Sequence, residues 1–393
     1  MDINVNINHL SGTIDPISSK STIHRSLICA LLSRSEVRIN KINFSKDVIA
    51  TIDILEKLNC KIKIVGNDLI IDSTDLKYYD GYLDCNESGS TLRFMIPVLL
   101  YLFNEAKVDG KKGLKKRPLD IYTNLFECDN NMLPIAFKGQ LKAKEYLIDG
   151  NVSSQFVSGL LFVLPLLDGD SKITFKTPLE SKQYVDLTID VLKEFNIRVF
   201  KKEDSIIIKG NQQYATNLIY VNEIDESNLA FFKVANELGS KIKFSEFNQK
   251  TSQPDAIIDE IIAIKPDIID VSEFPDLLPI LAVLCCFNEH ETKLINASRT
   301  MIKESNRLVA ITKELNKIGA NITIINDSLL IKPVDKFISS TVDSHNDHRI
   351  AMSLVIASLK CDNIIINNVQ AIDKSYPEFL QIISELGGNI KIL

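Results

Sequence analysis

The sequence predicts an α/β protein of two similar domains, each holding three copies of one repeated unit of strands and helices. Two kinds of helix alternate along the chain, and this alternation recurs six times. Short segments of alternating apolar residues follow many of the helices. At 393 residues the chain is also too long for one ordinary hydrophobic core, so two domains are expected.

The first kind of helix opens with small or polar residues and then becomes almost continuously apolar. Comparable residues in successive copies, such as Ser21, Ser90 and Ser154, recur at intervals near one sixth of the chain. The six segments are residues 18–32, 88–102, 152–167, 225–238, 274–287 and 345–359.

The second kind of helix is amphipathic and usually leads into an alternating strand. Its copies are expected in residues 53–65, 190–200, 312–325 and 381–393, with weaker ones at 257–264 and 119–126. Three of the following segments are predicted hairpins, at residues 61–72, 198–209 and 322–333. Each unit is therefore predicted to run strand, helix, strand, helix, and then one or two further strands.

Six units divide as three plus three, with the boundary expected near residues 221–225. One predicted domain holds residues 19–224. The other holds residues 1–18 and 225–393, because the later half otherwise lacks a closing strand.

Composition excludes several function classes. A net charge of −6 argues against a general nucleic-acid binder, and no apolar segment is long enough to predict a membrane helix. The N-terminus has no export signal, and seven cysteines without a C-x-x-C pair predict reduced thiols, so a cytoplasmic protein is expected. The histidines and cysteines form no metal-ligand cluster, and no Walker or dinucleotide motif occurs, so no metal and no cofactor is expected.

Candidate binding residues gather where the first kind of helix begins. Helix N-termini bind anions because their N–H groups are free and the helix dipole is positive there. For the serines, simple helix capping is the alternative. The candidates are Lys20, Ser21 and Arg25 in the first helix, Gly89 and Arg93 in the second, and Ser153, Ser154 and Gln155 in the third.

The later half offers both cations and carboxylates. Lys303 and Arg307 are four residues apart at the predicted start of an amphipathic helix that ends at Gly319, so they would share one face beside Glu304. Asp276 follows a proline at another helix start. Two carboxyl groups among cations can serve as base and acid, although a cap for Asp276 and an ion pair for Glu304 are the alternatives.

Further cations lie in short polar stretches. Arg117, Arg349 and Lys374 each stand beside a helix start or a proline, and arginine suits phosphate and carboxylate groups by bidentate contact. The basic run at residues 111–116 is interpreted as a solvated loop. His348 is a possible proton carrier, with a structural hydrogen bond as the alternative.

Nine motifs in order resemble the 5-enolpyruvylshikimate-3-phosphate synthase family. They cover the chain from about residue 15 to residue 380, in consistent spacing. The motifs are residues 19–25 (SKSTIHR), 86–93 (NESGSTLR), 117–118 (RP), 152–156 (VSSQF), 181–186 (SKQYVD), 275–276 (PD), 303–308 (KESNRL), 346–352 (NDHRIAM) and 374–379 (KSYPEF).

The resemblance implies a fold of two domains, each of three βαβαββ units in an inside-out α/β barrel, which close around the substrates as a monomer. It implies transfer of the enolpyruvyl group of phosphoenolpyruvate to the 5-hydroxyl of shikimate-3-phosphate by addition and elimination, with release of phosphate. Asp276 would be the base at the 5-hydroxyl and Glu304 the acid at C3 of phosphoenolpyruvate.

The resemblance also implies which residues bind each substrate. Those for shikimate-3-phosphate are Lys20, Ser21, Arg25, Ser153, Ser154, Gln155 and Ser181, with Asp276 and Lys303 at the ring hydroxyls. Those around phosphoenolpyruvate are Gly89, Arg93, Arg117, Arg307, Arg349 and Lys374, while Lys20 and Gln155 would touch both substrates. The roles of Arg93, Arg299, Tyr184 and His348 stay open.

Two departures and two alternatives accompany this interpretation. Glu87 replaces a common asparagine of the family, and Asn306 replaces an aspartate between the acid and Arg307. The nearest alternative is a UDP-N-acetylglucosamine 1-carboxyvinyltransferase, but residues 108–118 lack the cysteine which that family usually carries there. The second alternative is a non-catalytic phosphate-binding member of the fold.

Overall fold

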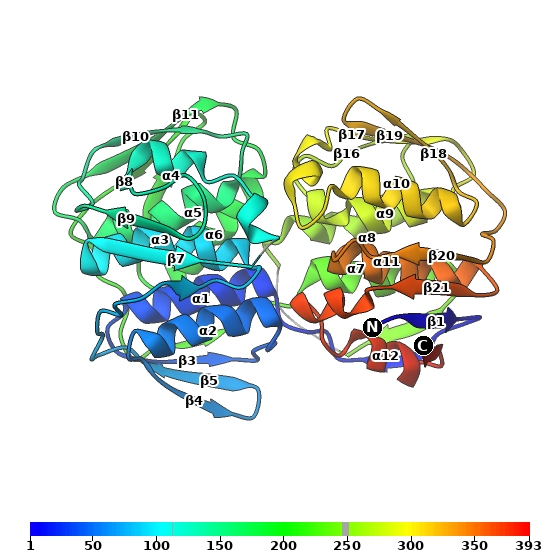
Figure 1. Ribbon diagram of the computed structural model, residues 1–393, viewed down its shortest axis with the longest axis horizontal. Helices are drawn as coiled ribbons and strands as arrows, with labels where there is room; N and C mark the ends of the chain where they lie inside the picture. Colours follow the sequence, from blue (N-terminus) through cyan, green and yellow to red (C-terminus); the bar gives the residue numbers. More distant parts are fainter. Residues whose placement is uncertain (112, 246–250) are drawn as a thin grey trace. The chain divides into compact units, whose positions relative to one another are not determined.

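The computed structural model describes residues 1–111, 113–245 and 251–393, and these form two compact units (Figure 1). Residues Ser18–Glu223 make up the continuous unit. The split unit combines Met1–Ile17 with Ile224–Leu393.

The predicted alternation of two helix kinds is confirmed in six consecutive helix pairs. In each pair the first helix is mainly apolar beyond its first turn and the second is amphipathic or short. The pairs are α1 (Lys20–Leu32) and α2 (Lys46–Lys57), α3 (Gly89–Phe103) and α4 (Asp120–Leu125), α5 (Ser154–Val163) and α6 (Lys182–Glu194), α7 (Glu226–Glu237) and α8 (Ile258–Ile264), α9 (Leu278–Cys285) and α10 (Arg307–Lys317), and α11 (His348–Ala357) and α12 (Phe379–Glu385).

Five four-stranded sheets repeat one pattern, in which a parallel pair of strands is extended by two antiparallel strands. A parallel pair needs a long crossover, and in four of these sheets the first helix of the unit supplies it. Three of these sheets are built from consecutive strands. They are β6 (Leu83–Asp84), β7 (Glu105–Asp109), β9 (Ile135–Lys138) and β8 (Glu127–Cys128); β10 (Glu145–Asp149), β11 (Ser171–Thr177), β13 (Ser205–Ile208) and β12 (Val199–Lys201); and β16 (Ile268–Asp270), β17 (Thr292–Ile295), β19 (Ser328–Lys332) and β18 (Asn321–Ile325).

The other two sheets are each completed by a strand from the opposite end of the unit. In the continuous unit β14 (Ile219–Val221) pairs in parallel with β3 (Glu36–Asn40). The next strands in this sheet are β5 (Asp68–Asp72) and then β4 (Lys61–Val65). In the split unit the N-terminal β1 (Ile3–Asn6) lies between β21 (Ile364–Asn367) and β22 (Asn389–Ile392), with β20 (Ser340–Asp343) at the edge. A two-stranded sheet joins β2 (Ser11–Ile14) to β15 (Lys241–Phe244).

The three predicted hairpins are confirmed as the antiparallel pairs β4 and β5, β12 and β13, and β18 and β19. In the first of them, Gly66 takes a φ of +63° in the turn, a conformation that glycine adopts without strain.

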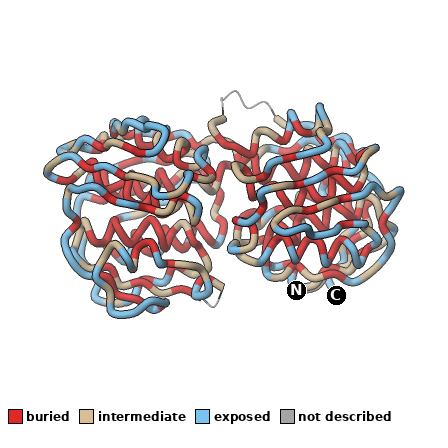
Figure 2. Tube along the Cα trace, turned by 90° about the horizontal axis from the view of Figure 1, so that it is seen from above, coloured by how far each residue is buried: buried red, intermediate tan, exposed pale blue. Residues whose placement is uncertain are grey.

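The first helix of each pair lies inside its unit, because a helix that is apolar all round must be covered on every side. Every residue of α9 and α11 is buried, and in α1 only Lys20 and Ser21 are partly exposed. Figures 1 and 2 show these buried helices within each unit and the exposed stretches along its outer turns. Among the described residues, no helix has the length and apolarity needed to cross a membrane.

One predicted helix start is wrong. Helix α10 begins at Arg307, not at Lys303, because the Asn306 side chain accepts a hydrogen bond from the Val309 N–H at 3.2 Å and caps the helix. Lys303 has an extended backbone after a short 3-10 turn, so Lys303 and Arg307 do not share a helix face. The predicted end is confirmed, since the helix stops at Lys317 and Gly319 takes a φ of +93°.

Close packing of α3 against α5 depends on Gly159. A Cβ atom at this position would lie 2.3 Å from the Tyr122 hydroxyl and 2.4 Å from the Arg93 carbonyl oxygen.

We predict that Gly159→Ala lowers the free energy of unfolding by about 1–3 kcal/mol, because the two helices must move apart. Urea unfolding followed by circular dichroism measures the effect. As a control, Ser384→Ala on the exposed face of α12 should change stability by less than about 0.5 kcal/mol. A Gly159→Ala protein as stable as the original would show that the helices separate without cost.

Candidate active site

The N-terminal end of α1 places Lys20 and Ser21 at the edge of the apolar core. Ser19 caps the helix by accepting the Thr22 N–H, and the first two residues of the helix are partly exposed. The Lys20 ammonium lies 2.9 Å from a carboxylate oxygen of Asp47, in the first turn of α2. Asp47 was not predicted from the sequence.

Arg25 is buried one turn further along α1 and ties it to α6. Its Nε donates to the Thr188 hydroxyl at 2.8 Å, and its two terminal nitrogens donate to the carbonyl oxygens of Ser21 at 2.7 Å and Tyr184 at 3.0 Å. Burial lowers the pKa of Arg25 to about 10, which leaves it charged at neutral pH. All three partners are neutral oxygens, so these hydrogen bonds hold the guanidinium in place without cancelling its charge.

Gly89 at the start of α3 is the centre of a second group. A Cβ there would lie 2.7 Å from an Arg117 nitrogen and 2.9 Å from an Arg93 nitrogen, so only glycine lets the two guanidinium groups approach the helix end. Arg93 donates to the Gln155 side-chain oxygen at 2.8 Å, and Gln155 donates to the Ser90 hydroxyl at 2.9 Å. The structure thus brings together the candidates Gly89, Arg93, Arg117 and Gln155, with Ser90 beside them.

The serine candidates occupy two helix starts. Ser153 caps α5 by accepting the Gln155 N–H at 3.3 Å, and Ser154 is the buried first residue of that helix. Ser181 precedes α6 with a φ of +49°, a left-handed conformation that is strained for serine and recurs at functional sites. Tyr184 lies in the next turn, and its carbonyl holds Arg25.

Glu87 and the basic run at residues 111–116 belong to the same unit. Glu87 lies against Gly113, where a Cβ would be 2.9 Å from its carboxylate. In the basic run, Lys111, Lys115 and Lys116 are exposed as predicted, and Lys112 lies outside the described residues.

Arg307 is the centre of the group in the split unit. Its side chain is 1% exposed and bonds three carboxylates, Asp347 at 2.8 Å, Asp276 at 2.7 Å and Glu304 at 2.6 Å. Burial alone would lower the pKa of Arg307, but the three carboxylates outweigh it and raise the pKa well above its usual range. The first turn of α10 therefore holds a permanently charged guanidinium that is surrounded by three carboxylates.

Asp276 stands between three cations. Its carboxylate lies 2.7 Å from Arg307, 3.2 Å from Lys303 and 3.1 Å from Arg349. Burial alone would raise the pKa of Asp276, yet these cations hold it well below its usual range. The same burial lowers the pKa of Lys303, and Asp276 opposes that shift. Asp276 is therefore ionised at neutral pH.

Arg349 and Lys374 complete the group. Arg349 is buried in the first turn of α11, where it also donates to the Ser227 hydroxyl at 2.9 Å. The Lys374 ammonium donates to the Asn346 carbonyl oxygen at 2.6 Å. Arg299 and His348 are both buried, and an imidazole nitrogen of His348 lies 4.0 Å from Asp347.

Asp347 is a site residue that sequence reasoning did not nominate. It is fully buried, caps α11 by accepting the Arg349 N–H at 2.9 Å, and holds both Arg307 and the Ser305 hydroxyl. An aspartate directly before an apolar helix is a capping signal, but its second role as the anchor of Arg307 depends on a residue 40 positions away.

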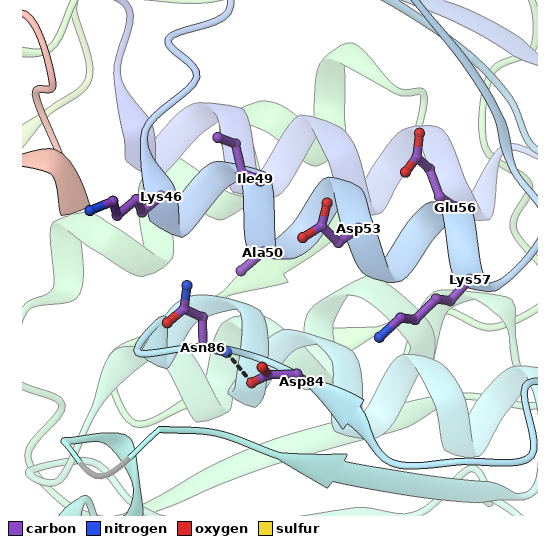
Figure 3. Close-up of a pocket in the computed structure, with 8 residues that line it drawn as sticks. All are labelled: Lys46, Ile49, Ala50, Asp53, Glu56, Lys57, Asp84 and Asn86. Atoms are coloured by element: carbon purple, nitrogen blue, oxygen red, sulfur yellow. Dashed lines mark hydrogen bonds between the residues drawn. The ribbon is translucent and has the colours of Figure 1, made fainter.

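A cavity of about 500 Å³ lies elsewhere in the continuous unit, between α2 and the segment before α3 (Figure 3). Its lining mixes acids and lysines, including Asp53, Lys57 and Asp84, and it contains none of the predicted site residues. Among residues 1–111, 113–245 and 251–393, no three or more His, Cys, Asp or Glu side chains are grouped to hold a metal ion.

Comparison with known proteins identifies the family. A family model described as EPSP synthase (3-phosphoshikimate 1-carboxyvinyltransferase) matches residues 5–264 and 219–383. The chain is 40% identical over 413 residues to the 3-phosphoshikimate 1-carboxyvinyltransferase of Clostridium perfringens, with 97% of each protein covered. It is 42% identical over 419 residues to that of Clostridium novyi, with 97% of this chain and 96% of the relative covered. The chain belongs to the EPSP synthase family.

Solved structures agree with the fold. EPSP synthase from Acinetobacter baumannii superposes with a TM-score of 0.83 at 20% identity and full coverage of both chains. An enolpyruvyl transferase from Streptomyces tendae gives a TM-score of 0.78 at 13% identity, with 99% of this chain and 98% of that chain covered. The predicted EPSP synthase fold of repeated βαβαββ units is confirmed, and the nucleotide-sugar alternative is not favoured.

The ionised state of Asp276 makes stability of this EPSP synthase family member depend on pH. Because its pKa is lower in the folded chain than in the unfolded one, the stabilisation is complete above about pH 4 and is lost as pH falls through the folded pKa. We predict that Asp276→Asn lowers the free energy of unfolding by about 1–3 kcal/mol from pH 5 to 8, and that this gap narrows below pH 4. Urea unfolding over a pH series tests this, with the exposed Asp362→Asn as a control that should show no gap. A gap that widened in acid would contradict the assignment.

Proposed function

We propose that this enzyme transfers the enolpyruvyl group of phosphoenolpyruvate to the 5-hydroxyl of shikimate-3-phosphate and releases phosphate. Family membership and relatives named 3-phosphoshikimate 1-carboxyvinyltransferase support this activity. The observation that carries the proposed mechanism is the contact of one buried guanidinium, Arg307, with both proposed acid/base residues, Asp276 and Glu304.

The continuous unit is proposed to bind shikimate-3-phosphate. The positive charge of Arg25 is not compensated by these hydrogen bonds, because the three oxygens that accept them are neutral. The ends of α1, α5 and α6 add N–H groups and hydroxyls. Lys20 would exchange Asp47 for a substrate anion. The proposed ligands are Lys20, Ser21, Arg25, Ser153, Ser154, Gln155 and Ser181.

Phosphoenolpyruvate carries a carboxylate and a phosphate, and we propose that Gly89, Arg117, Arg307, Arg349 and Lys374 bind them. The Gly89 site suits an anion, because two guanidinium groups meet a helix N-terminus there. In the split unit an arriving anion must compete with the carboxylates already on Arg307 and Arg349. Asp276 would then contact both Lys303 and the ring hydroxyls of shikimate-3-phosphate.

That competition gives the carboxylates their proposed roles. Asp276 is ionised and can accept the proton of the 5-hydroxyl as its oxygen attacks C2 of phosphoenolpyruvate. An anion bound among Lys303, Arg307 and Arg349 would weaken the field that keeps Asp276 a poor base. Glu304 would take up a proton when the arriving anion displaces it from Arg307, and would deliver that proton to C3, which becomes a methyl group.

The second half of the reaction restores the double bond. The tetrahedral adduct loses phosphate from C2 and a proton from C3, so the enolpyruvyl ether forms. The C3 proton would return to Glu304 and the proton held by Asp276 would leave with the phosphate, so both residues recover their first states. The proposed cations stabilise the carboxylate and the departing phosphate. We further propose a cytoplasmic monomer that binds neither nucleic acid nor membrane, on the basis of the family resemblance and the net charge of −6.

The first experiment measures phosphate release from phosphoenolpyruvate by the purified protein. We predict release with shikimate-3-phosphate and none with UDP-N-acetylglucosamine as co-substrate. Release only with the nucleotide sugar would overturn the proposed substrate. Binding of shikimate-3-phosphate without release would indicate a non-catalytic member.

A second experiment tests the acid. We predict that Glu304→Gln lowers kcat by about 10²–10⁴-fold, because the amide cannot donate an acidic proton, while calorimetry shows nearly unchanged binding of shikimate-3-phosphate. Glu260→Gln, an exposed position on α8 of the same unit, is the matched control and should keep full activity. A Glu304→Gln enzyme with a normal rate would remove Glu304 from the mechanism.

A further inference from the structure

A chain of buried polar side chains crosses the core of the continuous unit beneath the candidate site. His24 Nδ1 lies 2.9 Å from the Thr51 hydroxyl, which lies 2.7 Å from the Thr91 hydroxyl, which donates to Ser88 Oγ at 2.7 Å. His24 is 1% exposed and the other three are fully buried. The four residues link α1, α2 and the start of α3.

The direction of each hydrogen bond follows from the last one. Because the Thr91 hydroxyl donates to Ser88, it must accept from Thr51, and Thr51 has then used its only proton. His24 Nδ1 must therefore carry a proton and donate it to Thr51. The chain predicts a neutral imidazole in its Nδ1–H form, with an unprotonated Nε2.

Burial and the surrounding charges favour a neutral imidazole. Burial, and then Lys20 and Arg25, lower the pKa of His24 well below its usual range. Nε2 is buried and has no hydrogen-bond partner among the described residues, so no contact there favours a proton on that nitrogen.

The chain ends at the helix cap that positions Gly89. Ser88 Oγ also accepts the Thr91 N–H at 3.2 Å, so the same oxygen closes the first turn of α3 and terminates the chain. Gly89 follows directly, in close contact with Arg93 and Arg117. A displacement of this turn by a few tenths of an ångström would change the spacing of both guanidinium groups at the helix end.

Buried hydroxyls and an imidazole in an otherwise apolar core cost stability unless every member is paired in one arrangement. A paired chain therefore fixes the position of α3 against α1 and α2 more narrowly than apolar packing would. The Lys20–Asp47 ion pair joins α1 to α2 at the same end of the unit.

We propose that His24, Thr51, Thr91 and Ser88 form a positioning relay that holds Gly89 and Arg93 in place for phosphoenolpyruvate. None of the four residues needs to touch a substrate. The inference rests on the proposed function, because it assigns the first turn of α3 to phosphoenolpyruvate and the start of α1 to the other substrate.

The test uses substitutions that remove one hydroxyl and keep the shape of the side chain. Thr51→Val should raise KM for phosphoenolpyruvate about fivefold to tenfold, the effect expected for one lost hydrogen bond. KM for shikimate-3-phosphate should change less than about twofold. Thr51→Ser keeps the hydroxyl and should restore both values. The matched control is Thr312→Val, since Thr312 is a buried helix residue whose hydroxyl bonds only the Leu308 carbonyl of its own helix.

Two further measurements separate a relay from simple packing. The double variant Thr51→Val with Thr91→Val should raise KM for phosphoenolpyruvate by less than the two single variants combined, because both changes break the bond between Thr51 and Thr91. Nitrogen NMR of labelled histidine should show His24 protonated at Nδ1 in the original protein and redistributed in Thr51→Val.

The outcomes distinguish this inference from the proposed function. If the original protein turns over both substrates but Thr51→Val raises both KM values equally, or neither, the relay is overturned. Protonation of His24 at Nε2 in the original protein would also overturn it. If the original protein shows no turnover, the proposed function fails, and the tautomer of His24 then decides whether the relay exists.

Discussion

In the described part of the chain, the first helix of each of the six pairs is mainly apolar beyond its first turn, and this constrains the whole architecture. Such a helix can be stable in water only when strands and other helices cover it completely. The helices therefore lie inside each unit, and the sheets and amphipathic helices form the outer layer. Polar residues are tolerated only where an inner helix begins, because its first N–H groups must be satisfied there in any case. The position of the candidate site is thus a consequence of how the core is built.

Charges at these helix starts are balanced differently in the two units. In the split unit Arg307, Arg349 and Lys303 meet three carboxylates, Asp276, Glu304 and Asp347, so positive and negative charges are equal in number. A buried cation without such partners would be severely destabilising. The same pairing means that a substrate anion cannot simply bind there. It must take over contacts that carboxylates now hold, which links binding to a change in the environment of the proposed acid and base.

Sequence reasoning located the repeated unit and the polar helix starts because both are local patterns. It placed Lys303 on a helix because it treated the apolar periodicity from Leu308 onward as if it began earlier, and it overlooked the cap at Asn306. Residues that act through distant partners were missed. Asp47 pairs with Lys20 from another helix, and Thr188 holds Arg25 across 163 positions of chain. No spacing rule connects such residues, since the tertiary fold alone brings them together.

Arg25 and Arg307 are both buried, but only the charge of Arg307 is compensated by carboxylates. Arg307 is surrounded by carboxylates, so its charge is compensated and its main effect is to fix the geometry of Asp276 and Glu304. Arg25 is equally buried, yet it donates only to two carbonyls and a hydroxyl, so its positive field extends to the start of α1. Burial lowers the pKa of His24, one residue away, and the charges of Lys20 and Arg25 lower it further. An uncompensated cation beside a helix N-terminus is costly to the empty protein and favourable once an anion arrives. The continuous unit is therefore suited to capturing a phosphate, while the balanced group of the split unit is suited to moving protons.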